Sequence, residues 1–131
     1  MRGMDAPLNE AALTDAAHQV VTLPCGRFRV RRDDRVIHAL GVRYATAPRF
    51  EQCVPVPATD ELIDATERGP ACPQLPSRLE FIVGSPTADL AQSEDCLVLD
   101  VVAPVAGGAA KPVMVFFHGG AYVTGSGQAP A

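Results

Sequence analysis

The residues with the clearest chemical meaning are His118-Gly119-Gly120-Ala121-Tyr122, which directly follow an apolar run. Consecutive small residues let the backbone turn sharply and direct successive N–H groups into one space. Gly suits such a turn because a Cβ would obstruct both the turn and the approach of a ligand. N–H donors held about 2.7–3.1 Å from a developing negative oxygen stabilise the tetrahedral intermediate of acyl transfer. The simpler alternative is that these residues only end a strand in a Gly-Gly turn.

A strand must position this loop, and the sequence supplies an apolar run for it. Residues 111–120, KPVMVFFHGG, contain no polar side chain from Pro112 to Phe117. Such a run is typical of a central strand in a sheet that helices cover on both faces. The run 96–104, CLVLDVVAP, predicts a second strand, with a turn at Gly107-Gly108 between the two. The covering helices are not encoded after residue 120, so we expect the chain to be incomplete as a domain.

Strands with one wet face are predicted nearer the N-terminus. Residues 18–23 and 27–32 flank Pro24-Cys25-Gly26 and indicate a β-hairpin. A third strand is expected over residues 36–45. Apolar and charged positions mix in these runs, as in antiparallel strands at a sheet edge.

The remaining segments predict little regular structure. Residues 45–95 are rich in proline, which favours an irregular covering loop packed against something larger. Residues 1–17 are polar and rich in Ala, and we expect a flexible N-terminal segment there. The domain proper is therefore expected over residues 18–131.

The composition argues against several classes of function. The 131 residues carry a formal net charge of −4 and their arginines are scattered, so no nucleic-acid surface is indicated. No run approaches the roughly 18 apolar residues of a membrane span. The acidic, polar start does not resemble a secretory signal, so we expect a cytoplasmic protein, although a misassigned start codon would leave secretion open. The four cysteines and three histidines lack metal-ligand spacing, so no metal and no cofactor are expected.

Four segments in order carry a more specific pattern. They are GVRYATAPRF (41–50), DATERGPACPQ (64–74), SEDCLVLDVVAP (93–104) and PVMVFFHGGAYVTGSG (112–127). These segments resemble the type-B carboxylesterase family, whose patterns are G-I-P-Y-A followed by R-F, D-A-T-x-x-G-P-x-C-P-Q, S-E-D-C-L-x-L-N-V-x-x-P and P-V-M-V-W-I-H-G-G-G-F. The resemblance implies an α/β class chain, the N-terminal part of an α/β-hydrolase fold in which antiparallel edge strands lead into the central sheet.

The resemblance also implies roles for the loop residues. In the family, the second and third small residues of H-G-G-G supply two N–H groups of the oxyanion hole, here Gly120 and Ala121. Gly119 would shape the loop. Ala121 stands where the family has a third Gly, so its N–H is retained while its methyl group would narrow the pocket. Tyr122 stands where the family has Phe and is expected to pack in a core or against the site.

Structural roles follow from the same resemblance. Cys72 and Cys96 occupy the positions of a family disulfide, which would stabilise the fold by about 3 kcal/mol in the chain-entropy model, although a cytosolic location favours free thiols. Arg49 and Glu94 match a buried ion pair of the family, and loss of one partner would strand a buried charge. Asp100 replaces the family's Asn.

The family's nucleophile, a Ser in G-x-S-x-G activated by a His and an acidic residue, is not found. The serines are Ser77, Ser85, Ser93 and Ser126, and none has this setting. We expect the N-terminal fragment of a serine carboxylesterase or lipase that hydrolyses small-molecule carboxylic esters through an acyl-enzyme, inactive by itself. Two alternatives stay open: a non-catalytic esterase-like binding module, since the family includes adhesion proteins without the nucleophile, and a subunit completed by a separately encoded C-terminal half.

Overall fold

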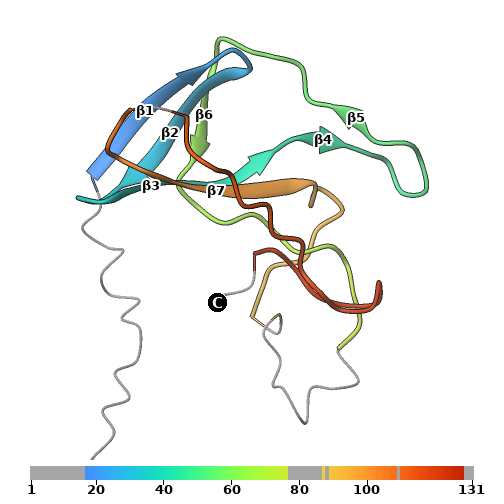
Figure 1. Ribbon diagram of the computed structural model, residues 1–131. Coiled ribbons are helices and arrows are strands. Elements are labelled where there is room, and N and C mark those ends of the chain that lie inside the picture. Colours follow the sequence, from blue (N-terminus) through green and yellow to red (C-terminus); the bar gives the residue numbers. More distant parts are fainter. Residues whose placement is uncertain (1–16, 77–86, 88, 109, 129–131) are drawn as a thin grey trace, which may run out of the picture.

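The computed structural model describes residues 17–76, 87, 89–108 and 110–128, and the elements in these ranges are all strands (Figure 1). Within the same ranges no helix is long and apolar enough to cross a membrane. The expected flexible segment 1–17 lies outside the described residues except for Ala17, where the first strand begins. The strands are β1 Ala17–Leu23, β2 Gly26–Arg32, β3 Val36–Arg43, β4 Ala45–Thr46, β5 Val54–Pro55, β6 Leu62–Ala65 and β7 Val98–Pro104.

The predicted N-terminal hairpin is confirmed by β1 and β2. The two strands pair antiparallel along their whole lengths, and Leu23 faces Gly26 across the turn. Side chains of β2 alternate between the two faces of the sheet, because Phe28 and Val30 are buried while Arg29 between them is exposed. One face of the hairpin is therefore exposed to solvent, as its mixture of apolar and charged residues predicts.

The second edge of β2 is shared by two strands. β6 pairs parallel with residues 27–30 of β2, and β3 pairs antiparallel with residues 31 and 32. β7 pairs antiparallel with β3, which completes the order β1-β2-β3-β7 (Figure 1). The sequence predicts mostly irregular structure over residues 45–95, and the structure adds three short strands there, β6 and the β4–β5 pair.

A small core lies on the inner face of this sheet. Phe28 and Val30 of β2 and Ala65 of β6 form it, with 7%, 1% and 0% of their surfaces exposed. Partly buried apolar side chains of β1, β3 and β6 pack around these three residues. Since the parallel β6 brings Ala65 into the core, the region after residue 60 is fixed to the sheet.

A bulge in β3 anchors the next segment of the chain. The register shifts between Ala39 and Val42, and Gly41 has a φ of +62°. A Cβ at Gly41 would lie 2.6 Å from the carbonyl oxygen of Glu67, so only Gly allows this close approach. The N–H of Gly41 donates to Oδ1 of Asp100 at 2.8 Å, a bond that the side-chain oxygen of the family's Asn could also accept.

The apolar run before the loop is not a strand. Residues 111–119 continue after β7 as an irregular trace (Figure 1). The five large apolar side chains of residues 113–117 are 68–92% exposed. A strand needs partners for its N–H and C=O groups, and no described residue pairs with this run. The expected central strand over residues 111–120 is therefore wrong here, whereas the strand predicted over residues 96–104 forms as β7 but leaves Val101 and Val102 largely exposed.

Candidate functional site

The loop after the apolar run folds into a tight turn. The carbonyl oxygen of Gly120 accepts hydrogen bonds from the N–H groups of Val123 and Thr124, at 3.0 and 3.1 Å. Gly120, Ala121 and Tyr122 have φ values of +129°, +53° and +61°. Three successive positive φ values are uncommon outside Gly, and they turn the backbone sharply where the small residues predict a turn.

Two peptide units of this loop are held by their carbonyl groups. His118 Nδ1 lies 2.8 Å from the carbonyl oxygen of Gly119, and since a carbonyl only accepts, the contact requires the proton on Nδ1. The carbonyl of Gly120 accepts the two bonds of the turn. In a planar trans peptide the N–H points opposite to the C=O, so the N–H groups of Gly120 and Ala121 point away from these contacts.

Both N–H groups are available to a ligand. Within the described ranges, neither the N–H of Gly120 nor that of Ala121 donates to a protein acceptor. Ala121 is exposed and Gly120 is partly exposed. The loop therefore offers two adjacent, oriented donors from consecutive residues, the pair that the sequence singles out.

The glycines of the loop differ in their steric importance. A Cβ at Gly120 would lie 1.7 Å from the carbonyl oxygen of Thr124, and a Cβ at Gly125 would lie 2.3 Å from that of Gly119. At Gly119 a Cβ would meet nothing within 4 Å among the described residues. The turn thus requires Gly at positions 120 and 125, while the shaping role of Gly119 stays a prediction. Tyr122 is fully exposed, so its expected packing is not seen in this part of the chain.

A side chain that the sequence analysis did not single out holds the loop from the sheet side. Gln74 Oε1 accepts hydrogen bonds from the N–H of Gly125 and the hydroxyl of Thr124, both at 2.7 Å. Its Nε2 donates to the carbonyl of Gly125 at 3.0 Å. Gln74 is the last residue of the segment that resembles D-A-T-x-x-G-P-x-C-P-Q, and this position in the motif was the one signal for it.

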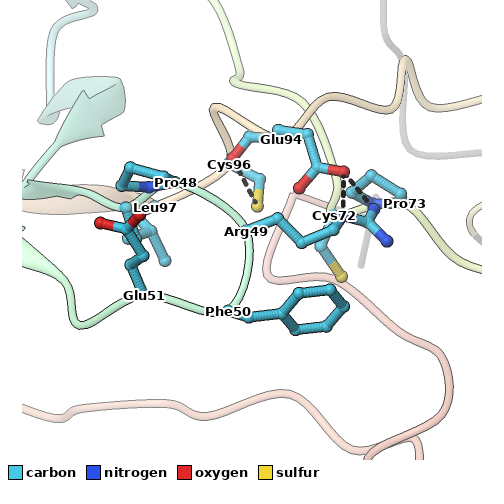
Figure 2. Close-up of a pocket in the computed structure, with 10 residues that line it drawn as sticks. Pro48, Arg49, Phe50, Glu51, Cys72, Pro73, Glu94, Cys96 and Leu97 are labelled. Carbon is cyan, nitrogen blue, oxygen red and sulfur yellow. Dashed lines mark hydrogen bonds and ion pairs between the residues drawn. The ribbon is translucent and has the colours of Figure 1, made fainter.

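The Arg49–Glu94 ion pair is present in the structure, with Arg49 Nε 2.8 Å from Glu94 Oε1 and a second contact from Nη2 (Figure 2). Each side chain is 56% exposed, so the expected burial of this pair is wrong. The burial fails because neither charge is covered by the described residues. Glu94 accepts the hydrogen bonds of Arg49 and thereby raises the pKa of the guanidinium. The pair joins the loop before residue 50 to the segment that leads into β7.

Cys72 and Cys96 line the same shallow pocket of about 350 Å³, together with the Arg49–Glu94 pair (Figure 2). Both cysteines are free thiols here, and the Cys96 thiol donates to the carbonyl of Glu94 at 3.6 Å. Burial, and then the charge of Cys72, raise the pKa of Cys96. The disulfide stays a prediction, since the two thiols face one pocket without a bond between them.

This pocket is separate from the loop chemistry, because none of residues 118–122 lines it. Its polar side chains are the paired Arg49 and Glu94, a second carboxylate at Glu51 and two thiols, with no His or Ser among its lining residues. Among the described residues, no three His, Cys, Asp or Glu side chains are grouped so that they could hold a metal ion. The oriented N–H groups of the loop are therefore the chemically informative feature.

Comparison with known proteins agrees with the four sequence segments. The pattern of the Carboxylesterase family matches residues 17–130. The chain is 44% identical over 115 residues to the probable N-octanoylanthranilate hydrolase AqdA2 of Rhodococcus erythropolis. The aligned region covers 83% of this chain and 24% of that protein. It is 38% identical over 117 residues to the para-nitrobenzyl esterase of Bacillus subtilis (strain 168), with 86% of this chain and 23% of that protein covered.

The fold agrees as well. A solved thermophilic PNB esterase is similar with a TM-score of 0.68 and 35% sequence identity, over 83% of this chain and 23% of that one. The chain thus spans about a quarter of the length of the curated relatives that it matches. It belongs to the carboxylesterase type-B family and corresponds to the N-terminal portion of its members.

Proposed function

We propose that this chain supplies the oxyanion-hole loop, within the N-terminal part of an α/β-hydrolase fold, of a serine enzyme that hydrolyses carboxylic esters. The observation that carries the proposal is the pair of unused N–H groups at Gly120 and Ala121, whose peptide units are fixed by their carbonyls. Relatives named as hydrolases and esterases support it. The substrate is then a small-molecule carboxylic ester.

The proposed chemistry assigns these donors a definite step. When a serine oxygen attacks the ester carbonyl carbon, the carbonyl electron pair moves onto the oxygen, which becomes an oxyanion. The N–H groups of Gly120 and Ala121 stabilise that charge more than they stabilise the neutral ester, which lowers the barrier. The alcohol then leaves with a proton, and water releases the acid from the acyl-enzyme by the same route.

The chain does not contain the attacking serine in the setting that this chemistry requires. None of its serines lies in G-x-S-x-G, the sharp turn that exposes the nucleophile in α/β-hydrolases. The exposed apolar run 113–117 is the surface on which the rest of such a domain would pack. The proposal therefore includes a partner segment, either continuous with this chain or separately encoded.

The first test is DNA sequencing beyond the codon for Ala131, translated in all forward frames. A G-x-S-x-G segment followed by acidic and His segments is the expected result. The product of the complete reading frame then hydrolyses p-nitrophenyl butyrate, while the 131-residue chain alone releases no burst of nitrophenol. An open frame without these segments, together with a purified product that hydrolyses no ester, would refute catalysis and favour the non-catalytic binding module.

A further inference from the structure

The side-chain amide of Gln74 uses its full hydrogen-bonding capacity. Oε1 accepts from Gly125 N and Thr124 Oγ1, both at 2.7 Å, while Nε2 donates to the carbonyls of Gly125 and Cys72 at 3.0 and 3.1 Å. An amide has two acceptor sites and two N–H donors, so all four are occupied. Gln74 therefore forms hydrogen bonds with both the N–H and the carbonyl of Gly125, as a neighbouring strand would.

Backbone contacts connect residues 124 and 125, which Gln74 binds, to the candidate oxyanion donors. Thr124, whose hydroxyl is bound by Gln74, donates its N–H to the carbonyl of Gly120 at 3.1 Å. That carbonyl belongs to the same peptide unit as the N–H of Ala121. Gly125 in turn lies so close to the carbonyl of Gly119 that a Cβ there would be at 2.3 Å. A shift of residues 124–125 would thus rotate the peptide units that carry both donors.

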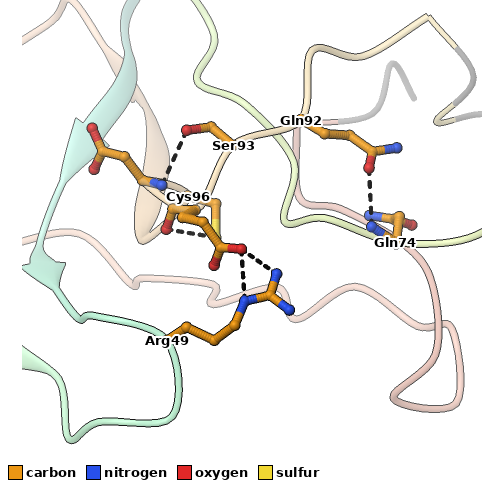
Figure 3. A network of polar contacts seen from close by, with 7 residues as sticks. Arg49, Gln74, Gln92, Ser93 and Cys96 are labelled. Carbon is orange, nitrogen blue, oxygen red and sulfur yellow. Dashed lines mark hydrogen bonds and ion pairs between the residues drawn. The ribbon is translucent and has the colours of Figure 1, made fainter.

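Gln74 is itself tied to the sheet. Its backbone N–H donates to Gln92 Oε1 at 3.0 Å (Figure 3). Ala71 and Gln92 form a parallel bridge, in which Ala71 N donates to Ala91 O at 2.8 Å and Ser93 N donates to Ala71 O at 3.0 Å. Residues 91–93 lead into β7, so the anchor of the loop is continuous with the sheet.

A second contact keeps the far end of the loop on the same segment. Gln128 is 3% exposed, and its Oε1 accepts from the N–H of Gly69 at 2.9 Å, while Arg68 Nη1 donates to the carbonyl of Gln128 at 2.8 Å. This contact lies three residues beyond Gly125 and touches neither Gly119 nor Gly120. Of the two attachments, only the one made by Gln74 reaches the turn with the donors.

We propose that Gln74 is a positioning residue that fixes the direction of the Gly120 and Ala121 N–H groups through Thr124 and Gly125, and so sets the stabilisation of the oxyanion. The proposal rests on the ester-hydrolase function proposed above. It predicts an effect of Gln74 on the transition state rather than on substrate binding, because a neutral ester gains little from these donors.

The test uses the product of the complete reading frame. Gln74→Met keeps the length of the side chain and removes all four bonds. Gln19→Met makes the same chemical change in β1, where the partly buried Gln19 accepts a hydrogen bond from Arg32 Nη1 at 3.1 Å. We expect Gln74→Met to lower kcat by about tenfold to a hundredfold with little change in KM, less than the hundred- to thousandfold loss typical of deleting one donor. Gln19→Met retains the wild-type kcat.

A trifluoromethyl ketone, which binds serine esterases as a tetrahedral oxyanion, separates positioning from stability. Its affinity falls with kcat/KM in Gln74→Met. The core variant Val30→Ala lowers the unfolding midpoint but keeps kcat and inhibitor affinity at temperatures well below unfolding. If Gln74→Met lowers only the midpoint, with kcat and inhibitor affinity unchanged, the positioning role is wrong. Gln74→Glu keeps the two accepting bonds and gives the same comparison should the Met variant fail to fold.

The loop amides distinguish failure of this proposal from failure of the proposed function. With isotopically labelled glycine, the amide signals of Gly120 and Gly125 are expected to shift in Gln74→Met and to stay in place in Gln19→Met. If the wild-type protein hydrolyses no ester but these shifts occur, the esterase function falls and the positioning of the loop by Gln74 stands. Unshifted signals overturn the positioning role whatever the activity.

Discussion

Replacing Gly120 by Ala should open the turn that orients the two proposed oxyanion donors. The new Cβ would lie 1.7 Å from the carbonyl oxygen of Thr124 and 2.6 Å from its carbonyl carbon, distances that no rotamer can relieve. Keeping the φ of +129° would add strain of about 1–3 kcal/mol on top of the clash. Breaking the two hydrogen bonds to Gly120 O costs about 0.5–1.5 kcal/mol each. Opening is therefore the cheaper response, at about 1–3 kcal/mol.

The consequence is measurable as a rate, because an opened turn no longer fixes the Ala121 N–H. In the product of the complete reading frame, Gly120→Ala should lower kcat for p-nitrophenyl butyrate by about a hundred- to thousandfold, the effect of losing one donor. Gly107→Ala is the matched control, since a Cβ there meets nothing within 4 Å among the described residues. If Gly120→Ala keeps the wild-type kcat, the assignment of this turn to oxyanion stabilisation is refuted.

Three further predictions concern the surrounding structure. Arg49→Met should lower the unfolding midpoint only slightly at low salt and leave it unchanged at high salt, because its ion pair is exposed and screened by ions. A large loss of midpoint that does not depend on salt would show that the pair is buried in the intact protein. The hydroxyl of Thr66, and then its N–H, donate to Asp64 and lower the pKa of this carboxyl below its ordinary value of 3.8. The ionised carboxylate therefore stabilises the fold fully above the unfolded pKa, and this stability is lost as pH falls through the lower folded pKa. The Asp64→Asn variant should lack this loss of stability in acid when unfolding is measured against pH. Because burial raises the pKa of Cys96, Ellman's reagent at about pH 8 should modify it more slowly than the exposed Cys25, and faster modification of Cys96 would contradict the burial.

The N-terminal hairpin was predictable because its signals are local. Alternating side chains and a short turn around residues 24–26 determine β1 and β2 without reference to the rest of the chain. β6 was missed because its four residues have no distinctive pattern and their partner lies about 35 residues earlier in β2. Its pairing follows from the core, where Ala65 packs beside Phe28 and Val30. No single segment of the sequence carries that information.

For the run 112–117, the sequence predicts a strand that the structure does not contain. Its composition predicts a covered strand, but a strand exists only when another backbone pairs with it, and no described residue does so here. Apolarity therefore predicted the environment that the segment requires rather than the structure it has in this chain. The candidate site, too, could be predicted only in part. The motif identified the loop that carries Gly120 and Ala121, whereas the contacts of Gln74 depend on how residues 68–74 lie against the sheet.

The unpaired run and the ordered loop together show where the geometry of the candidate site originates. The turn at Gly120 forms although the residues directly before it are exposed and make no strand. Its support comes from Gln74, whose segment is fixed by the bridge of Ala71 to Gln92 and by the close approach of Gly41 to Glu67. Because these supports all lie within the described chain, the contacts that orient the two N–H groups form here without the rest of the central sheet. Packing of the apolar run against a partner segment and orientation of the two N–H groups are therefore physically separable.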